Sequence, residues 1–153
     1  MQVDSYLVPE CIARPRSFGG LMTLYEANFI KLHTLLGKHR PAEGGYCSTV
    51  PGDCDLHLQV HEQTRYTCTF TLTYWFDEPH GAIADPDLSG RIYYDARMVE
   101  VRDWAAHHKH AGLISLSDAV RSAAGPIETR WTRNIMFSKW LDYLDELGHG
   151  FQP

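Results

Sequence analysis

The sequence of 153 residues contains no stretch of about eighteen consecutive apolar residues, so no transmembrane helix is expected. A secretory signal is not expected either, because the first twenty residues carry four charged side chains and no continuous apolar segment. The net charge of -5 argues against nucleic-acid binding through a broad basic surface. The four cysteines form no Cys-x-x-Cys pair, which favours a reduced, cytoplasmic protein.

The motifs of several enzyme classes are missing as well. The sequence has no glycine-rich phosphate loop, no Gly-x-Ser-x-Gly elbow, no His-Glu-x-x-His helix and no cysteine–histidine nucleophile motif. No complete catalytic constellation is present, and no cofactor is expected. These absences favour a non-enzymatic binding or regulatory module over an enzyme.

The strongest regular pattern is an alternation of residues from Thr64 to Trp75, which predicts a long, half-buried β-strand. Its apolar face consists of Tyr66, Cys68, Phe70, Leu72 and Tyr74. The opposite face, from Thr67 to Thr73 and ending at Trp75, is the first candidate for a protein partner or homodimer surface. The segment Leu56–Glu62 also alternates, so the two segments are expected to pair as an antiparallel hairpin.

Apolar stripes at helical spacing predict two helices, over Leu21–Leu36 and over Ile127–Leu147, which end at Gly37 and Gly148. The expected fold is α+β, with a single antiparallel β-sheet of about three to five strands packed by an N-terminal and a C-terminal helix. Residues 1–18 are expected to form an irregular N-terminal arm, and residues 19–150 a single domain.

The segment Asp77–Gly90 is expected to be a solvated loop, because prolines and glycines interrupt any regular pattern there. The segment Arg91–Val101 is expected to form two short strands, or one strand with a bend, around Asp95, whose carboxylate can bond the backbone N–H groups of a turn.

Four sequence blocks resemble one known family. They are Leu24-Tyr25-Glu26-Ala27-Asn28-Phe29, Glu62-Gln63-Thr64-Arg65-Tyr66-Thr67, Tyr93 through Asp95-Ala96-Arg97-Met98 to Val101, and Asn134 through Trp140-Leu141 to Gly148. The chain resembles the DUF1249 family, the YqiB-like uncharacterised proteins of proteobacteria. The resemblance implies a bacterial protein, and it implies no reaction, because the activity of the family is not established.

The polar residues of these blocks are the candidate ligand or partner contacts. They are Asn28, Arg65, Asp95, Arg97, Glu100 and Asn134. One hypothesis is that they line a patch between sheet and helices that binds an unknown protein partner or a second copy of the chain. Asn28 lies inside the apolar stripe of the first helix, so it either bonds the backbone of a neighbouring loop or strand or contacts a ligand.

A second hypothesis is a small enzyme or sensor that acts on a nucleotide or other anionic metabolite. Arg65 and Arg97 could both bind a phosphate or carboxylate, and Asp95 or Glu100 could act as a general base. The structural alternative is that Asp95 caps a turn and that Arg97 pairs with Glu100 across a strand. Convergence of Arg65, Asp95, Arg97 and Asn28 in one concave pocket would favour the anionic ligand.

A third hypothesis is metal binding. If the segment after Val101 is helical, Asp103, His107 and His110 share one helix face at a spacing that suits a divalent transition metal. A solvated histidine-rich surface is the alternative. His57 and His61 share a strand face but lie roughly 13 Å apart along it, so they cannot chelate one metal together.

Overall fold

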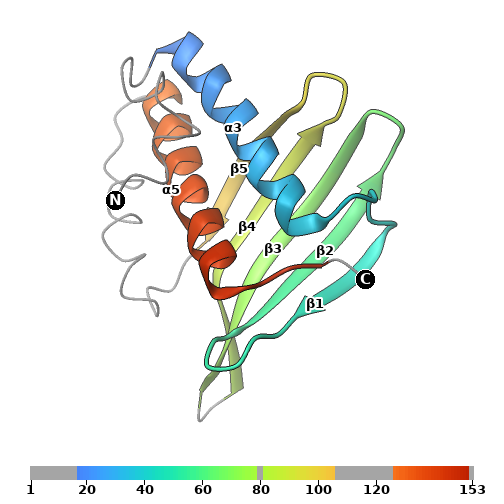
Figure 1. Cartoon of the computed structure of the whole chain (residues 1–153). Helices are drawn as coiled ribbons and strands as arrows, with labels where there is room; N and C mark the ends of the chain where they lie inside the picture. The colour runs from blue at the N-terminus through green and yellow to red at the C-terminus, as the bar shows by residue number, and fades with distance from the viewer. Residues whose placement is uncertain (1–16, 79–80, 106–125, 152–153) are drawn as a thin grey trace.

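The computed structural model describes residues 17–78, 81–105 and 126–151. A five-stranded antiparallel sheet has the strand order β1-β2-β3-β4-β5, and both helices pack on one of its faces (Figure 1). In chain order the elements are α3 (Phe18–Leu36), β1 (Gly44–Ser48), β2 (Asp55–Gln63), β3 (Thr67–Glu78), β4 (Gly81–Tyr93), β5 (Met98–Ala105) and α5 (Pro126–Leu147). The predicted α+β architecture is confirmed.

The main core lies between the sheet and the two helices, where the apolar residues of β3 meet Phe29 and Leu32 of α3 and Phe137 and Trp140 of α5. Cys68, Phe70, Leu72 and Tyr74 are buried in it, as their alternation predicts. Cys68 acts there as a small apolar residue, since it is a free cysteine.

The prediction that Tyr66 belongs to this core face is wrong, because its side chain is 54% exposed. The strand begins one residue later, at Thr67. Thr64 and Thr67 instead close a turn, in which the backbone N–H of Thr64 donates to the Thr67 carbonyl at 2.8 Å. The side chain of Thr64 then accepts a hydrogen bond from the backbone N–H of Thr67 at 3.0 Å.

The loop prediction for Asp77–Gly90 is also wrong, since this segment contains the end of β3 and most of β4. Tertiary pairing accommodates its strand-breaking residues. Pro86 falls in a β-bulge between β3 and β4, where a residue need not donate to the ladder. At Gly90 a Cβ atom would lie 2.7 Å from the Glu100 carbonyl oxygen and 2.9 Å from Phe70, so glycine permits the close packing there.

Each predicted helix is present. The Ser17 side chain caps α3 by accepting a hydrogen bond from the backbone N–H of Gly20, and Gly37 ends the helix with a φ of 89°. The two helices contact each other through a second apolar cluster that includes Leu21, Leu24 and Trp131. Among the described helices, none is long and apolar enough to span a membrane.

Candidate functional site

Three of the candidate polar residues form hydrogen bonds inside the fold. Asn28 and Asn134 are fully buried, and the amide of Asn28 donates to the Asn134 carbonyl at 2.9 Å, which joins α3 to α5. The side chain of Asn134 accepts from the backbone N–H of Val101 at 2.9 Å, and its amide donates to the Arg130 carbonyl at 2.8 Å. Asn28 therefore has a structural contact, as one of the two interpretations predicted, but the backbone it bonds belongs to helix α5 and not to the predicted loop or strand.

Glu100 is held by two tyrosines. Its carboxylate accepts hydrogen bonds from Tyr25 at 3.3 Å and from Tyr93 at 2.9 Å. Burial, together with the negative charge of Glu100, raises the pKa of Tyr25 to about 12. Both tyrosines therefore stay protonated donors at neutral pH, and Glu100 joins α3 to the β4–β5 hairpin.

The other three candidates lie on turns at one end of the sheet. Asp95 is exposed in the β4–β5 turn, and Arg97 adopts the left-handed region there with a φ of 54°. Its guanidinium lies over the Phe29 ring at 5.1 Å and not against Glu100. Arg65 is exposed beside its neighbour Tyr66. Arg65, Asp95, Arg97 and Asn28 do not converge in one pocket, because Arg97 is the only one of the four that lines the pocket at this end.

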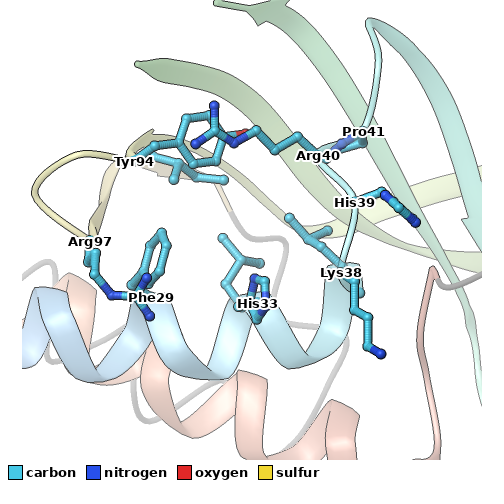
Figure 2. Close-up of a pocket in the computed structure, with 12 residues that line it drawn as sticks. Phe29, His33, Lys38, His39, Arg40, Pro41, Tyr94 and Arg97 are labelled. Carbon is cyan, nitrogen blue, oxygen red and sulfur yellow. The ribbon is translucent and has the colours of Figure 1, made fainter. Parts of the chain in front are cut away.

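That pocket is a cavity of about 150 Å³ between α3, the segment that follows it and the end of β4 (Figure 2). It is lined by Phe29, Leu32, His33, Leu36, Gly37, Lys38, His39, Arg40, Pro41, Ile92, Tyr94 and Arg97. None of these lining residues is acidic, although the chain as a whole carries a net charge of -5. Positive charge is therefore concentrated at this site.

Two arginines line the pocket. Figure 2 shows the Arg40 side chain extending over Tyr94, with its guanidinium carbon 3.7 Å from the ring centroid, and Arg97 beside Phe29. Arg40 also donates from Nη1 to the Arg65 carbonyl at 2.7 Å. These contacts fix the arginines from one side and leave further N–H groups of each guanidinium for a ligand.

Tyr94 stays neutral in the pocket. Its hydroxyl donates to the Gln63 side chain at 2.9 Å, and burial raises the pKa of Tyr94 to about 12. A second hollow of about 340 Å³ shares Leu36, His39, Arg40 and Pro41 with the first, so the segment after α3 borders both. No sequence motif predicts this pocket, because its walls come from segments more than fifty residues apart.

A buried network that the sequence patterns did not reveal joins Ser48, Asp53 and His149. Ser48 Oγ lies 3.0 Å from His149 Nδ1, and His149 Nε2 lies 2.7 Å from Asp53 Oδ2. The side chain of Ser48 also accepts from the backbone N–H of Gly150 at 3.0 Å. Serine, histidine and aspartate are the residue types of a hydrolase triad. Ser48, however, is only 6% exposed and does not line the described pockets, so a substrate could not reach it. The network instead fastens the C-terminal segment to the sheet.

Asp53 accepts a further hydrogen bond from Tyr74 at 2.6 Å. Burial alone would raise the pKa of Asp53, but the hydrogen bonds from Tyr74 and His149 outweigh it and hold that pKa below its ordinary value.

The hypothesis of a metal site at Asp103, His107 and His110 assumed that Asp103 lies in a helix, and this assumption is wrong. Asp103 lies in strand β5, and His107 and His110 lie outside the described residues. Within the described part of the chain, the side chains that could hold a metal are Cys47, Asp55 and His57, on β1 and β2.

The threonine face of β3 lies on the sheet surface opposite the helices, and Thr71 bonds both His61 and Ser89 there. Its role as a partner or dimer surface stays a prediction.

A family model described as "Protein of unknown function (DUF1249)" matches residues 31–150. The matched range includes the pocket residues from Leu32 to Pro41 together with Tyr94 and Arg97, and it leaves out Phe29. Comparison with curated proteins and with solved structures found no significant match.

Proposed function

Since the chain belongs to the DUF1249 family, whose function is unknown, we propose its function from the pocket: a cytoplasmic, non-enzymatic module that binds a small anionic metabolite. The observation that carries the proposal is the pair of guanidinium groups of Arg40 and Arg97, each placed over an aromatic ring that lines the cavity, whose described lining residues include no acidic side chain. Guanidinium groups recognise phosphate and carboxylate through paired N–H donors.

The size of the cavity narrows the class of ligand. Pockets for drug-sized ligands usually measure about 300–1,000 Å³, whereas this cavity measures about 150 Å³. It therefore suits one phosphate or carboxylate group and the atoms beside it. The second hollow, across Arg40 and Pro41, offers room for the remainder of a larger metabolite such as a nucleotide.

The residue types of the lining also bear on catalysis. In the described part of the chain they include no serine, threonine, cysteine, aspartate or glutamate, so these nucleophiles and the carboxylate bases are missing from the wall of the pocket. The proposal of binding without catalysis rests on these missing groups, since His33, Lys38 and His39 have no such partner among the described lining residues. Asp95 and Glu100, the two candidate bases, do not line the cavity, and Asp95 is exposed on the turn.

Thermal unfolding in the presence of phosphate, pyrophosphate, citrate and adenine nucleotides tests the proposal. A ligand at about one hundred times its Kd stabilises a protein by about 2.7 kcal/mol, which raises the Tm of a domain of this size by about 5–11 °C. Arg97→Asn and Arg40→Gln are expected to abolish the shift. Asparagine tolerates the left-handed backbone at Arg97, so that variant is expected to fold.

Arg65→Ala is the matched control, because Arg65 is a neighbouring exposed arginine that does not line the pocket and whose carbonyl still accepts from Arg40. Its Tm shift should equal that of the wild type. The proposal fails if no anion raises the Tm, or if Arg65→Ala removes the shift while Arg97→Asn keeps it.

A further inference from the structure

Three side chains of the metal-ligand type gather on the sheet face that the helices leave uncovered. They are Cys47 of β1 and Asp55 and His57 of β2. One ligand atom from each lies within 4.8 Å of the others, and Cys47 Sγ is 3.8 Å from His57 Nε2. The cluster is separate from the anion pocket, whose lining residues include none of the three.

Strand geometry explains why these residues meet. Cys47 and His57 are direct partners in the β1–β2 ladder, and directly opposed residues place their side chains on the same face. Asp55 lies two residues before His57, so it shares that face too. Leu56, between them, is fully buried on the side of the helices, which fixes the cluster on the opposite side.

We propose that Cys47, Asp55 and His57 form a zinc site with one open coordination position. Typical Zn–S and Zn–N bonds of about 2.3 and 2.0 Å in a tetrahedral site place the sulfur and nitrogen about 3.5 Å apart, near the observed 3.8 Å. A thiolate, an imidazole and a carboxylate form a mixed ligand set that suits Zn²⁺, and the two anionic ligands balance its charge.

The surroundings leave room for a fourth ligand. Cys47, His57 and Trp75 line a surface hollow of about 370 Å³ on this face. The Trp75 ring meets His57 edge-on, with the ring centroids 6.1 Å apart, and so restrains the imidazole. A zinc ion there would hold a water or a small exogenous ligand in the hollow, as in sites with three protein ligands.

Cobalt titration of protein purified without a histidine tag tests this site. One equivalent of Co²⁺ is expected to produce a thiolate-to-cobalt charge-transfer band, and Zn²⁺ is expected to displace it. Cys47→Ser should lose the band, and His57→Gln and Asp55→Asn should weaken binding. The side chains of Cys47 and Asp55 are exposed, so the metal-free variants are expected to give the wild-type circular dichroism spectrum.

Cys54→Ser and His61→Gln are matched controls, because each removes the same type of group from outside the cluster, and both should keep the band. The inference is overturned if Co²⁺ gives no thiolate band, or if the band survives in Cys47→Ser. Zinc binding that survives Cys47→Ser but disappears in a His107→Gln, His110→Gln double variant would also overturn it, by placing the metal on the other histidines.

Discussion

Replacing Asn134 with alanine removes the side chain that bonds the outer edge of β5. Among the described residues this strand is the last of the sheet, and its backbone pairs there with β4 alone. On the other side, Asn134 of α5 accepts from the Val101 N–H at 2.9 Å and donates to the Val101 carbonyl at 3.5 Å. A single buried amide therefore takes the place of a neighbouring strand at this position.

The loss of stability in Asn134→Ala depends on which backbone groups lose their hydrogen-bond partner. A buried backbone N–H without a partner costs about 1–3 kcal/mol, and Val101 is only 1% exposed. Losing the longer contact to the Val101 carbonyl adds a smaller loss of stability. The Arg130 carbonyl keeps its backbone hydrogen bond within the helix. We therefore expect Asn134→Ala to lower the free energy of unfolding by about 2–4 kcal/mol, and the Tm by about 4–16 °C.

Asn28→Ala is the matched comparison, because both asparagines are fully buried. Asn28 donates to the Asn134 carbonyl, which the helix ladder already satisfies. Asn28 Oδ1 has no hydrogen-bond partner among the described residues. Removing this buried oxygen therefore offsets part of the stability that is lost with the hydrogen bond. We expect Asn28→Ala to cost only about 1 kcal/mol.

Urea unfolding followed by tryptophan fluorescence measures both variants on one scale. Equal destabilisation, or a larger loss for Asn28→Ala, would refute the reasoning, since the difference depends on which backbone groups lose their partner. Anion binding in the pocket should persist in both folded variants, because neither asparagine lines that cavity.

Two further predictions concern stability. Gly90→Ala should lower the free energy of unfolding by about 1–3 kcal/mol through overpacking, because its Cβ would lie 2.7 Å from the Glu100 carbonyl oxygen. Gly19→Ala, whose Cβ meets nothing within 4 Å, should be neutral or slightly stabilising in urea unfolding, and equal losses for the two would contradict the packing. The lowered pKa of Asp53 contributes stability above the ordinary carboxyl pKa of 3.8, and this contribution is lost as the pH falls through the folded-state value. The stability difference between wild type and Asp53→Asn should therefore shrink in acid, and a constant difference would argue against this role.

The sequence alone determined the elements with strong local periods. The alternation in β2 and β3 and the apolar stripes of α3 and α5 each recur within a few residues, so the side that faces the core can be inferred without the fold. The glycines that end both helices act through local backbone geometry as well. The α+β architecture followed from these patterns, because an apolar sheet face and two apolar helix stripes must cover one another.

The tertiary structure overrode the local sequence pattern where the two favoured different conformations. The prolines and glycines of Asp77–Gly90 are typical of a loop, yet β3 and β5 pair with this segment from both sides. Tyr66 continued the alternation of its neighbours, but it lies in the turn that Thr64 and Thr67 close before β3 begins, and its side chain is exposed. Hydrogen bonds to distant strands outweigh local preferences of about 1 kcal/mol.

The candidate sites depended almost entirely on the tertiary structure. Asn134 and Arg97 both come from the family-like sequence blocks, yet Asn134 bonds a strand edge and Arg97 borders the pocket. The positions of these residues in the sequence do not distinguish the two roles. The partners of Arg97 and Arg40 in the pocket come from distant segments. Likewise, only the β1–β2 register brings Cys47 beside His57. Periodicity specifies which face of an element a residue occupies, whereas a site requires several faces to meet, and only long-range packing decides that.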